Sequence, residues 1–582
     1  MSGSGSRRPR LPVSLGESRQ LFLRVVSILA FGLLVGIIGA VLAIVVVDSI
    51  FWLGDRLSAV TAGGAGPLNV VLLLCPVAGG LVVGLMMRGM SIRRAARVAD
   101  IIYGVQTRET GIPWRDGVLN TVATVIGIGS GASVGHYSPL ANMGAALGTN
   151  LGRGFRYDPV LGIGCGVAAA ISTAFSAPIA AVLFAHEVIL RHYSLRAFAP
   201  ITVASSTGFF IEHHLLARPP LFEVHVERSV FAPEFLAFVI TGLACALVAV
   251  AFMHLLLTSA DLAERSRLPA WLRPAVAGLG VGLMAQWVPE VLGLGKDVLS
   301  GIIGGGETAP WHLGLILLAK MLATSLCIGF GFAGGVFSPS LLIGVLAGAL
   351  LGHASGAVLG EMASDPALYA VCGMAAVASA VIGGPLTAVL IVFELTRNYE
   401  LTIAVMISVV FANVVAYHLF GRSLYDRQLA RSGFDLSLGR DRLMLQRTTV
   451  ADHVTDDAVT VKSDQSLADA RDGMIAAGHQ ECHVLDELSR YHGRLHLFDL
   501  LRLEKDADPA VEAAGAHANE GHPRIRPDQA VWDALEMVQE SGAQSIPVVD
   551  RGGYFIGVVY ESTLVAAYFR AISNTRAEEH AA

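Results

Sequence analysis

Two glycine-rich stretches of this chain carry the residue types that could bind an anion in an apolar setting. Their shared residues fall in one register, with Gly131, Gly135, Ser138-Pro139, Gly144 and Gly148 in the first stretch and Gly331, Gly335, Ser338-Pro339, Gly344 and Gly348 in the second. Each stretch reads as a loop followed by a helix with proline in its first turn, where a missing N–H is tolerated. The N–H groups that remain free, together with the positive helix end, favour an anion. We therefore predict one buried anion site built from both helix starts.

The elements that must position these helix starts lie in an unusually apolar chain. Its 582 residues are 53% hydrophobic and 15% charged, which is too apolar for a soluble globule. Several apolar runs between residues 20 and 435 are shorter than the roughly 20 residues that cross a bilayer, and others are broken by Gly or Pro. Short, broken segments in two corresponding halves indicate a substrate site near the membrane midplane. We predict an α-helical polytopic membrane protein with two repeats (about 20–215 and 230–435), inverted unless the number of crossings makes them parallel.

Each half also carries a glutamate nine residues after a proline, Glu187 after Pro178 and Glu394 after Pro385. An ionisable residue in an apolar run is a functional hypothesis by default. Their occurrence in both halves favours a structural role as helix caps or at an interface. Lys320 has two interpretations, an attractor of anions or a packing residue paired with a carbonyl.

The two ends of the chain differ in charge. The arm at 1–17 is basic and is expected in the cytoplasm by the positive-inside rule. Residues 440–582 carry 14 Lys and Arg against 24 Asp and Glu, a net charge of −10, so an acidic, water-soluble tail is predicted to follow the membrane body at 18–436 and a linker at 437–445. No basic stripe interleaves with aromatic residues, so nucleic-acid binding is not expected. The six cysteines have no CxxC spacing, which predicts reduced thiols and no metal site.

Three separated motifs resemble the CLC family of chloride channels and transporters. The family's Gly-x-Phe-x-Pro is intact as Gly335-Val-Phe-Ser-Pro339, its Gly-Arg-Glu-Gly-Pro corresponds to Gly135-His-Tyr-Ser-Pro139, and its Pro-Leu-Tyr corresponds to Ser423-Leu424-Tyr425. The resemblance implies that the N–H groups of Val336 and Phe337 and the Tyr425 hydroxyl hold a dehydrated anion at the centre. The implied anion-binding set is Gly135, His136, Tyr137, Ser138, Gly335, Val336, Phe337, Ser338 and Tyr425. Amides and a hydroxyl suit this task, because conduction needs binding weak enough to release the ion.

Three departures from the family pattern bear on mechanism. The glutamate that gates the outer pathway, and carries the proton in the family's exchangers, is Tyr137, and the inner proton glutamate is Val188. The family's anion-facing serine is expected near 95–99, where this chain reads Ala95-Ala-Arg-Val-Ala99. An unperturbed tyrosine titrates near pH 10, so neither replacement carries protons near neutral pH. We therefore expect passive anion flux, with Tyr137 as a neutral gate, and an unsettled anion preference.

Two alternatives stand beside this hypothesis. An anion–proton antiporter could use His136 as its outer proton carrier, although a solvated vestibule histidine is the commoner case. Gly131-Ala-Ser133-Val-Gly135 also matches the G-x-S-x-G of serine hydrolases, but that elbow needs a strand before the serine. An intramembrane serine hydrolase is accordingly a remote alternative, and we expect no enzyme.

The acidic tail resembles a tandem CBS domain, with one unit at 446–508, the next at 519–572, a linker at about 506–520 and a last segment at 573–582. Ser545-Ile-Pro-Val-Val-Asp550 followed by Phe555-Ile-Gly-Val-Val559 carries the resemblance. CBS pairs often bind adenine nucleotides, and Asp499 would then contact the ribose. His496, Tyr560 and Thr563 depart from that pattern, which favours a dimerising regulatory module without nucleotide. The sequence thus predicts a homodimeric, multi-pass carrier of chloride or a similar anion in the inner membrane bilayer, with both ends cytoplasmic.

Overall fold

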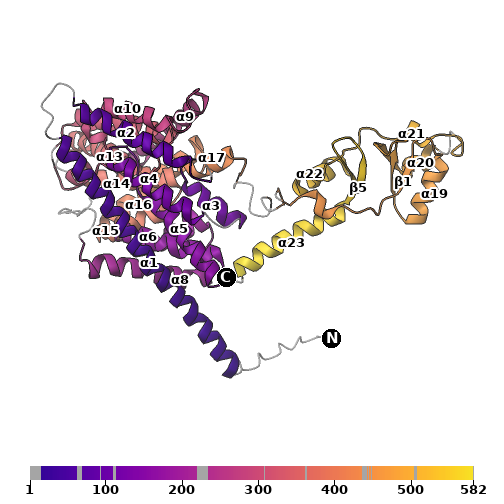
Figure 1. The fold of residues 1–582 in the computed structure, drawn as a ribbon, viewed down its shortest axis with the longest axis horizontal. Helices are drawn as coiled ribbons and strands as arrows, with labels where there is room; N and C mark the ends of the chain where they lie inside the picture. Colours follow the sequence, from indigo (N-terminus) through magenta and orange to yellow (C-terminus); the bar gives the residue numbers. More distant parts are fainter. Residues whose placement is uncertain are drawn as a thin grey trace. The chain divides into compact units, whose positions relative to one another are not determined.

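The protein divides into two compact units, residues 1–433 and 434–582, in a computed structural model. The structure describes residues 15–61, 69–91, 94–108, 113–218, 234–306, 308–360, 364–435, 442, 445–446, 448–503 and 508–580. The first unit is helical and the second combines helices with short strands (Figure 1).

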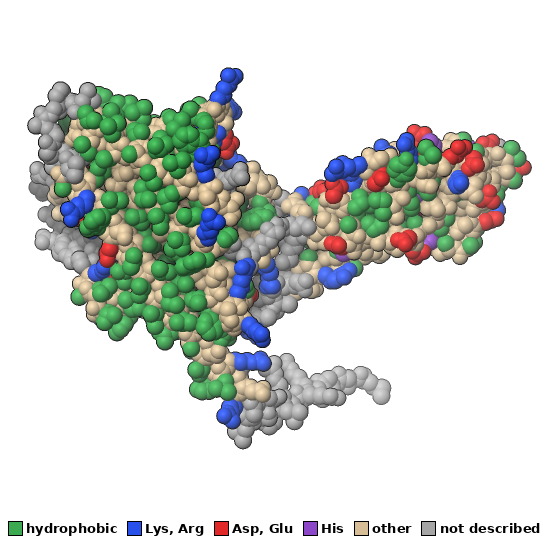
Figure 2. Space-filling model, viewed as in Figure 1, with side chains coloured by type: hydrophobic (Ala, Val, Ile, Leu, Met, Phe, Trp, Pro, Cys, Tyr) green, Lys and Arg blue, Asp and Glu red, His purple; other side chains and the backbone are tan. Residues whose placement is uncertain are grey.

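The membrane unit contains six helices that are long and apolar enough to cross a bilayer, within the described residues. These spans are Phe22–Leu57, Val70–Met87, Phe235–Arg265, Pro310–Gly329, Phe337–Leu359 and Tyr399–Arg431. Shorter apolar helices cover Pro159–Phe175, Pro178–Leu190, Pro366–Ile382 and Pro385–Thr396. Hydrophobic side chains cover most of the visible face of this unit (Figure 2). The predicted polytopic helical fold with broken helices is confirmed.

The helices of the membrane unit have the following bounds. They are α1 (Leu15–Thr61), α2 (Val70–Met87), α3 (Val98–Thr107), α4 (Trp114–Gly129), α5 (Tyr137–Gly154), α6 (Pro159–Phe175), α7 (Pro178–Phe184) continuing as the π-helix Ala185–Leu190, α8 (Leu195–Phe209), α9 (Phe235–Arg265), α10 (Arg273–Met284), α11 (Lys296–Ile303), α12 (Pro310–Gly329), α13 (Phe337–Leu359), α14 (Pro366–Ile382), α15 (Pro385–Thr396), α16 (Tyr399–Leu419) and α17 (Leu424–Arg431).

The glycines of the two motif stretches let helix pairs approach closely. A Cβ on Gly148 of α5 would lie 1.8 Å from the carbonyl oxygen of Gly162 on α6. In the second half, a Cβ on Gly348 of α13 would lie 2.1 Å from the carbonyl oxygen of Tyr369 on α14. Such small residues at helix contacts allow backbone-to-backbone packing in membranes. The same close packing therefore holds α5 against α6 and α13 against α14.

The tail contains two small sheets flanked by helices. Strands β1 (Thr460–Lys462), β2 (Glu481–Leu485) and β3 (Tyr491–His496) form one sheet, in which β1 and β2 are parallel and β2 and β3 antiparallel. Strands β4 (Ser545–Val549) and β5 (Phe555–Tyr560) form an antiparallel pair. The helices are α19 (Leu467–Ala477), α20 (Leu497–Leu503), α21 (Ala514–His517), α22 (Val531–Ser541) and α23 (Glu561–His580).

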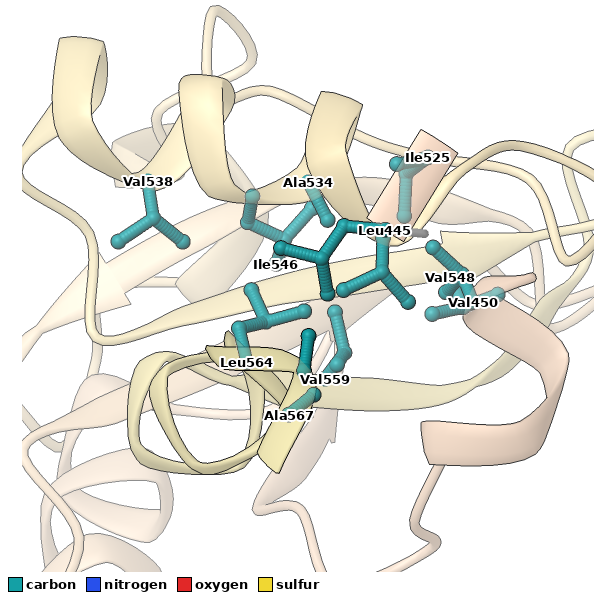
Figure 3. Packing of buried hydrophobic residues seen from close by; sticks show 12 residues of the cluster. Leu445, Val450, Ile525, Ala534, Val538, Ile546, Val548, Val559, Leu564 and Ala567 are labelled. Carbon is teal, nitrogen blue, oxygen red and sulfur yellow. The ribbon is translucent and has the colours of Figure 1, made fainter. Parts of the chain in front are cut away.

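The two halves of the tail exchange short segments. Leu445, from the predicted linker at 437–445, and Val450, from the start of the predicted first unit, pack into the core of the second with Ile546 and Val559 (Figure 3). Ala514, which lies in the predicted linker, packs into the core of the first. The predicted linker at 506–520 is therefore not a simple connection, because its residues from 513 onward pair with the first half of the tail. The tail's domain boundaries stay a prediction.

Candidate functional site

The two motif loops meet in the core of the membrane unit. Gly135 and Gly335 exchange a pair of backbone hydrogen bonds, each 2.7 Å long. A Cβ on Gly335 would lie 2.0 Å from the Ser138 hydroxyl oxygen, and one on Gly135 would lie 2.8 Å from that of Ser338. Only glycine fits at these two positions. The crossing of the two loops places the first turns of α5 and α13 side by side. The predicted juxtaposition of the two helix starts is thus seen in the structure.

Aromatic rings surround this crossing. The Tyr137 ring stacks on Phe175, with ring centroids 3.8 Å apart and planes 13° apart, and meets the edge of Phe337 at 5.5 Å. Phe175 and Phe337 are themselves 5.3 Å apart. Tyr137 is 2% exposed, and its hydroxyl has no hydrogen-bond partner among the described residues. Tyr137, the predicted gate residue, is therefore a ring packed against two others.

Tyr425, on α17 at the C-terminal end of the membrane unit, also lies at the crossing of the two motif loops. It is buried in the first turn of α17, and its hydroxyl lies beside the Ser138 side chain. Ser423 caps α17 at its N-terminus, and Asp426 pairs with Arg191 at 2.5 Å. These contacts fix the direction of the short helix, so that the tyrosine reaches the first motif.

His136 lies inside this cluster and not in a solvated vestibule. It is 4% exposed, its ring centroid lies 4.0 Å from that of Tyr137, and its Nδ1 is 3.5 Å from the Ser338 hydroxyl oxygen. The expectation of a solvated histidine is wrong. His136 directly precedes α5, and the crossing of the two motif loops buries it.

The two apolar-run glutamates cap helices of the opposite half. Glu187 accepts hydrogen bonds from the N–H groups of Leu386 and Thr387 at 3.1 and 2.8 Å, at the start of α15. Glu394 accepts from Ile179 and Ala180 at 2.9 and 2.8 Å, at the start of α7. Helix N-termini leave such donors unsatisfied, so the predicted cap role is confirmed. Val188, next to Glu187, is 1% exposed and offers no titratable group.

Residues 95–99, where the family's anion-facing serine was expected, lead into α3, and Ala96 lies in the core. Ala96 is fully buried, and its N–H and C=O groups are bonded by the side chains of Asn120 and Asn142. Sequence reasoning missed both asparagines. The available signal was an amide side chain within a helix of the membrane unit, because such a side chain requires hydrogen-bond partners when it is buried.

The remaining candidates have structural partners. The Lys320 ammonium is fully buried and donates to the carbonyls of Val291 and Gly293 at 3.0 and 2.8 Å, in line with a packing role. Ser133 follows a helix and not a strand, and its hydroxyl pairs with that of Thr324 at 3.0 Å, which removes the hydrolase elbow. The six cysteines are free thiols. Within the described ranges, no three His, Cys, Asp or Glu side chains gather to hold a metal.

The tail's candidate nucleotide-binding residues differ in their surroundings. Asp499 is exposed on α20. The Tyr560 hydroxyl donates to the Asp457 carbonyl, and its ring stacks on His479 with centroids 5.7 Å apart. A packed tyrosine thus occupies the position at which a ribose-binding hydroxyl was expected in the second unit.

A buried polar network joins the two sheets of the tail. Glu481 pairs with Arg494 at 2.6 Å and accepts from the Ser545 hydroxyl at 2.8 Å, while His483 Nε2 lies 3.2 Å from the same hydroxyl. Burial raises the pKa of Glu481, but the hydrogen bond from Ser545 and the charge of Arg494 outweigh it and hold that pKa below its usual value. Burial lowers the pKa of His483 to about 3, and that of His522 to about 4.

Comparison with known proteins identifies the family of the membrane unit. The profile described as voltage gated chloride channel matches residues 79–417, more than half of the chain. This chain belongs to that family. A CLC family member is a chloride channel or an anion/proton transporter, and this chain is a multi-pass membrane protein of that kind. A CBS domain profile also matches residues 521–570.

Individual relatives agree with this assignment. The CLC chain is 31% identical over 374 residues to a ClcB-like chloride channel protein of Ralstonia nicotianae, covering 62% of this chain and 86% of that protein. It is 27% identical over 556 residues to chloride channel protein CLC-f of Arabidopsis thaliana, covering 83% and 70%.

Solved structures show the same fold at low identity. A slow cyanobacterial Cl⁻/H⁺ antiporter superposes with a TM-score of 0.62 at 21% identity, covering 70% of this chain and 97% of that one. A eukaryotic CLC transporter superposes with a TM-score of 0.60 at 19% identity, covering 94% and 98%. The second match extends over the tail as well as the membrane unit.

Proposed function

We propose that this CLC protein conducts chloride-like anions passively, through a pathway in each subunit of a homodimer. The observation that carries this proposal is the chemistry of the gate position. Tyr137 is a neutral ring stacked on Phe175, and Val188 is an apolar side chain at the inner position. An exchanger needs a group that alternates between binding a proton and standing aside for the anion. Neither side chain carries out that exchange near neutral pH.

The anion would lie where the free N–H groups of the α5 and α13 first turns and the Tyr425 hydroxyl come together. The proposed ligands are the N–H groups of Val336 and Phe337 at the centre and those of residues 136–138 on the outer side. The N–H groups of Gly135 and Gly335 are left out, because each donates to the carbonyl oxygen of the other glycine. These donors carry partial charges, so binding is moderate and release is fast. The ring of Tyr137 would close the outer end and swing aside to open it.

The orientation follows from charge. We infer that the basic N-terminal arm and the acidic tail are cytoplasmic and that a bacterial host would hold the protein in its inner membrane. The tail would act as a dimerising modulator. Nucleotide binding at Asp499 is the weaker proposal, since Tyr560 is committed to Asp457 and His479.

Flux coupling in liposomes tests the mechanism. Protein-containing vesicles would receive equal chloride on both sides and a pH difference across the membrane, with internal chloride and internal pH followed together. A passive pathway moves no net chloride under these conditions, whereas an exchanger accumulates it uphill. Uphill chloride movement in the wild-type protein would refute the passive mechanism.

The second candidate is an antiporter that uses His136. Its supporting observation is position, since the imidazole lies 4.0 Å from the gate ring and its Nδ1 is 3.5 Å from the Ser338 hydroxyl oxygen. Under this mechanism the His136→Ala variant would abolish uphill chloride movement while still allowing downhill efflux. A His136→Gln variant provides a comparison that keeps a hydrogen-bonding side chain without a titrating one.

A further inference from the structure

Two buried asparagines hold the loop ahead of α3 against the anion motif. Asn120 lies on α4 and Asn142 on α5, and both are 0% exposed. The Asn120 Oδ1 accepts from the Ala96 N–H at 3.1 Å. The Asn142 Nδ2 donates to the carbonyls of Ala96 and Ser138 at 3.2 and 3.0 Å. The pair therefore ties Ala96 to α4 and to the first turn of α5, where the anion motif lies.

These partners fix the orientation of both amides. A backbone N–H can only donate, so Asn120 must present its oxygen to Ala96, and carbonyls can only accept, so Asn142 must present its nitrogen. What remains is the Nδ2 donor of Asn120 and the Oδ1 acceptor of Asn142. Neither has a hydrogen-bond partner in the part of the chain that the structure describes. A buried donor without an acceptor costs roughly 1–3 kcal/mol, so an acceptor is favoured beside Asn120.

The position of this donor matters for the anion. Ala96 lies in the stretch where the family resemblance places an anion-facing serine, and a methyl group donates no hydrogen bond. The free N–H groups of Asn120 belong to the same carboxamide whose oxygen is 3.1 Å from the Ala96 nitrogen. A donor is thus available next to the position that lacks one.

We propose that Asn120 donates an amide N–H to the transported anion in place of the hydroxyl that Ala96 lacks, and that Asn142 is a positioning residue for this contact. The ligand is a small monovalent anion such as chloride or nitrate. This inference rests on the proposed function, since it assigns a further ligand of the same pathway. It makes Asn120 a determinant of anion preference.

A purely structural role predicts something different. Asn120 and Asn142 could serve only to hold the loop, with their free donor and acceptor meeting each other after a small side-chain movement. Substitution would then lower the amount of folded protein but leave the relative rates for different anions unchanged. The ratio of chloride to nitrate efflux separates the two roles, because it does not depend on how much protein is active.

The experiment measures chloride and nitrate efflux from liposomes containing full-length protein. Asn120→Ala removes the donor, and Asn120→Asp keeps the acceptor for Ala96 while placing a carboxylate oxygen where the donor was. We expect both to lower chloride efflux about tenfold, the equivalent of one lost hydrogen bond of about 1.4 kcal/mol, and to change the chloride-to-nitrate ratio. Thr124→Val is the matched control, since Thr124 is equally buried one turn along α4 and its hydroxyl donates to the backbone carbonyl of Asn120.

A rescue sharpens the test. Adding Ala96→Ser to Asn120→Ala supplies a hydroxyl at the neighbouring position and is expected to restore the chloride-to-nitrate ratio towards the wild-type value. A wild-type ratio in both single Asn120 variants, or a double variant that restores nothing, would overturn the inference. Failure of the proposed function has a different signature, because wild-type vesicles would then show either no anion efflux above protein-free vesicles or uphill chloride movement under a pH difference.

Discussion

The Tyr425 hydroxyl offers the most direct test of the anion site. Tyr425→Phe removes one oxygen from a ring that is 3% exposed and keeps the packing of α17. The lost group is a buried hydroxyl that lies beside the Ser138 side chain and the proposed anion. A hydrogen bond to a charged partner contributes roughly 1.5–3 kcal/mol, so the chloride dissociation constant should rise about 10- to 150-fold.

Isothermal titration of the purified protein with chloride measures this change. Tyr417→Phe is the control, since Tyr417 lies on α16 with 55% of its surface exposed and loses the same atom away from the site. Size-exclusion chromatography and thermal unfolding establish that both variants are folded. Wild-type chloride affinity in a folded Tyr425→Phe variant would refute the assignment of the central site to this hydroxyl.

Three further predictions concern the gate and the tail. Tyr137→Ala should preserve or raise passive chloride efflux, since it removes the ring stacked on its neighbour, and a loss of efflux would instead make the hydroxyl a required ligand. Deleting residues 446–582 should leave a conducting membrane unit, and a folded but silent truncation would make the tail an obligatory gate. The isolated tail should lose stability as the pH falls from 7 to 5: His483 and His522 have folded-state pKa values of about 3 and about 4, so the unfolded chain binds more protons in this window. His483 alone contributes a loss of about 2 kcal/mol at pH 5; urea unfolding that is flat with pH in this range would contradict the buried network, and His483→Gln should flatten the wild-type slope.

Much of the architecture could be predicted because its signals are local. Broken apolar runs predicted short membrane helices. Proline after a glycine loop predicted two helix starts, which the structure places at Tyr137 for α5 and at Phe337 for α13. In the tail, the two runs that carry the CBS resemblance form β4 (Ser545–Val549) and β5 (Phe555–Tyr560). In each case the backbone preference of the residues involved acts within one or two turns.

The site was less predictable because its contacts join distant segments. His136 was expected to be a solvated vestibule histidine, but the crossing of Gly135 and Gly335 encloses it. Asn120 and Asn142 carry no motif, and their role depends on a loop 24 residues from the first and 46 from the second. Sequence spacing gives no information on such partners, since they are set by how helices pack.

The sequence by itself determined that this protein is a membrane protein, that its Gly and Pro stretches recur in two halves, that the predicted gate position holds a neutral side chain and that the tail is acidic. Those properties follow from composition, from the spacing of Gly and Pro, and from the identity of Tyr137 and Val188. Only the tertiary structure decided that Glu187 and Glu394 each cap a helix of the opposite half and that Tyr425 reaches Ser138. The physical reason is that helix ends within the membrane lack water to satisfy their free N–H groups, so the partner that does so is chosen by packing across the whole unit.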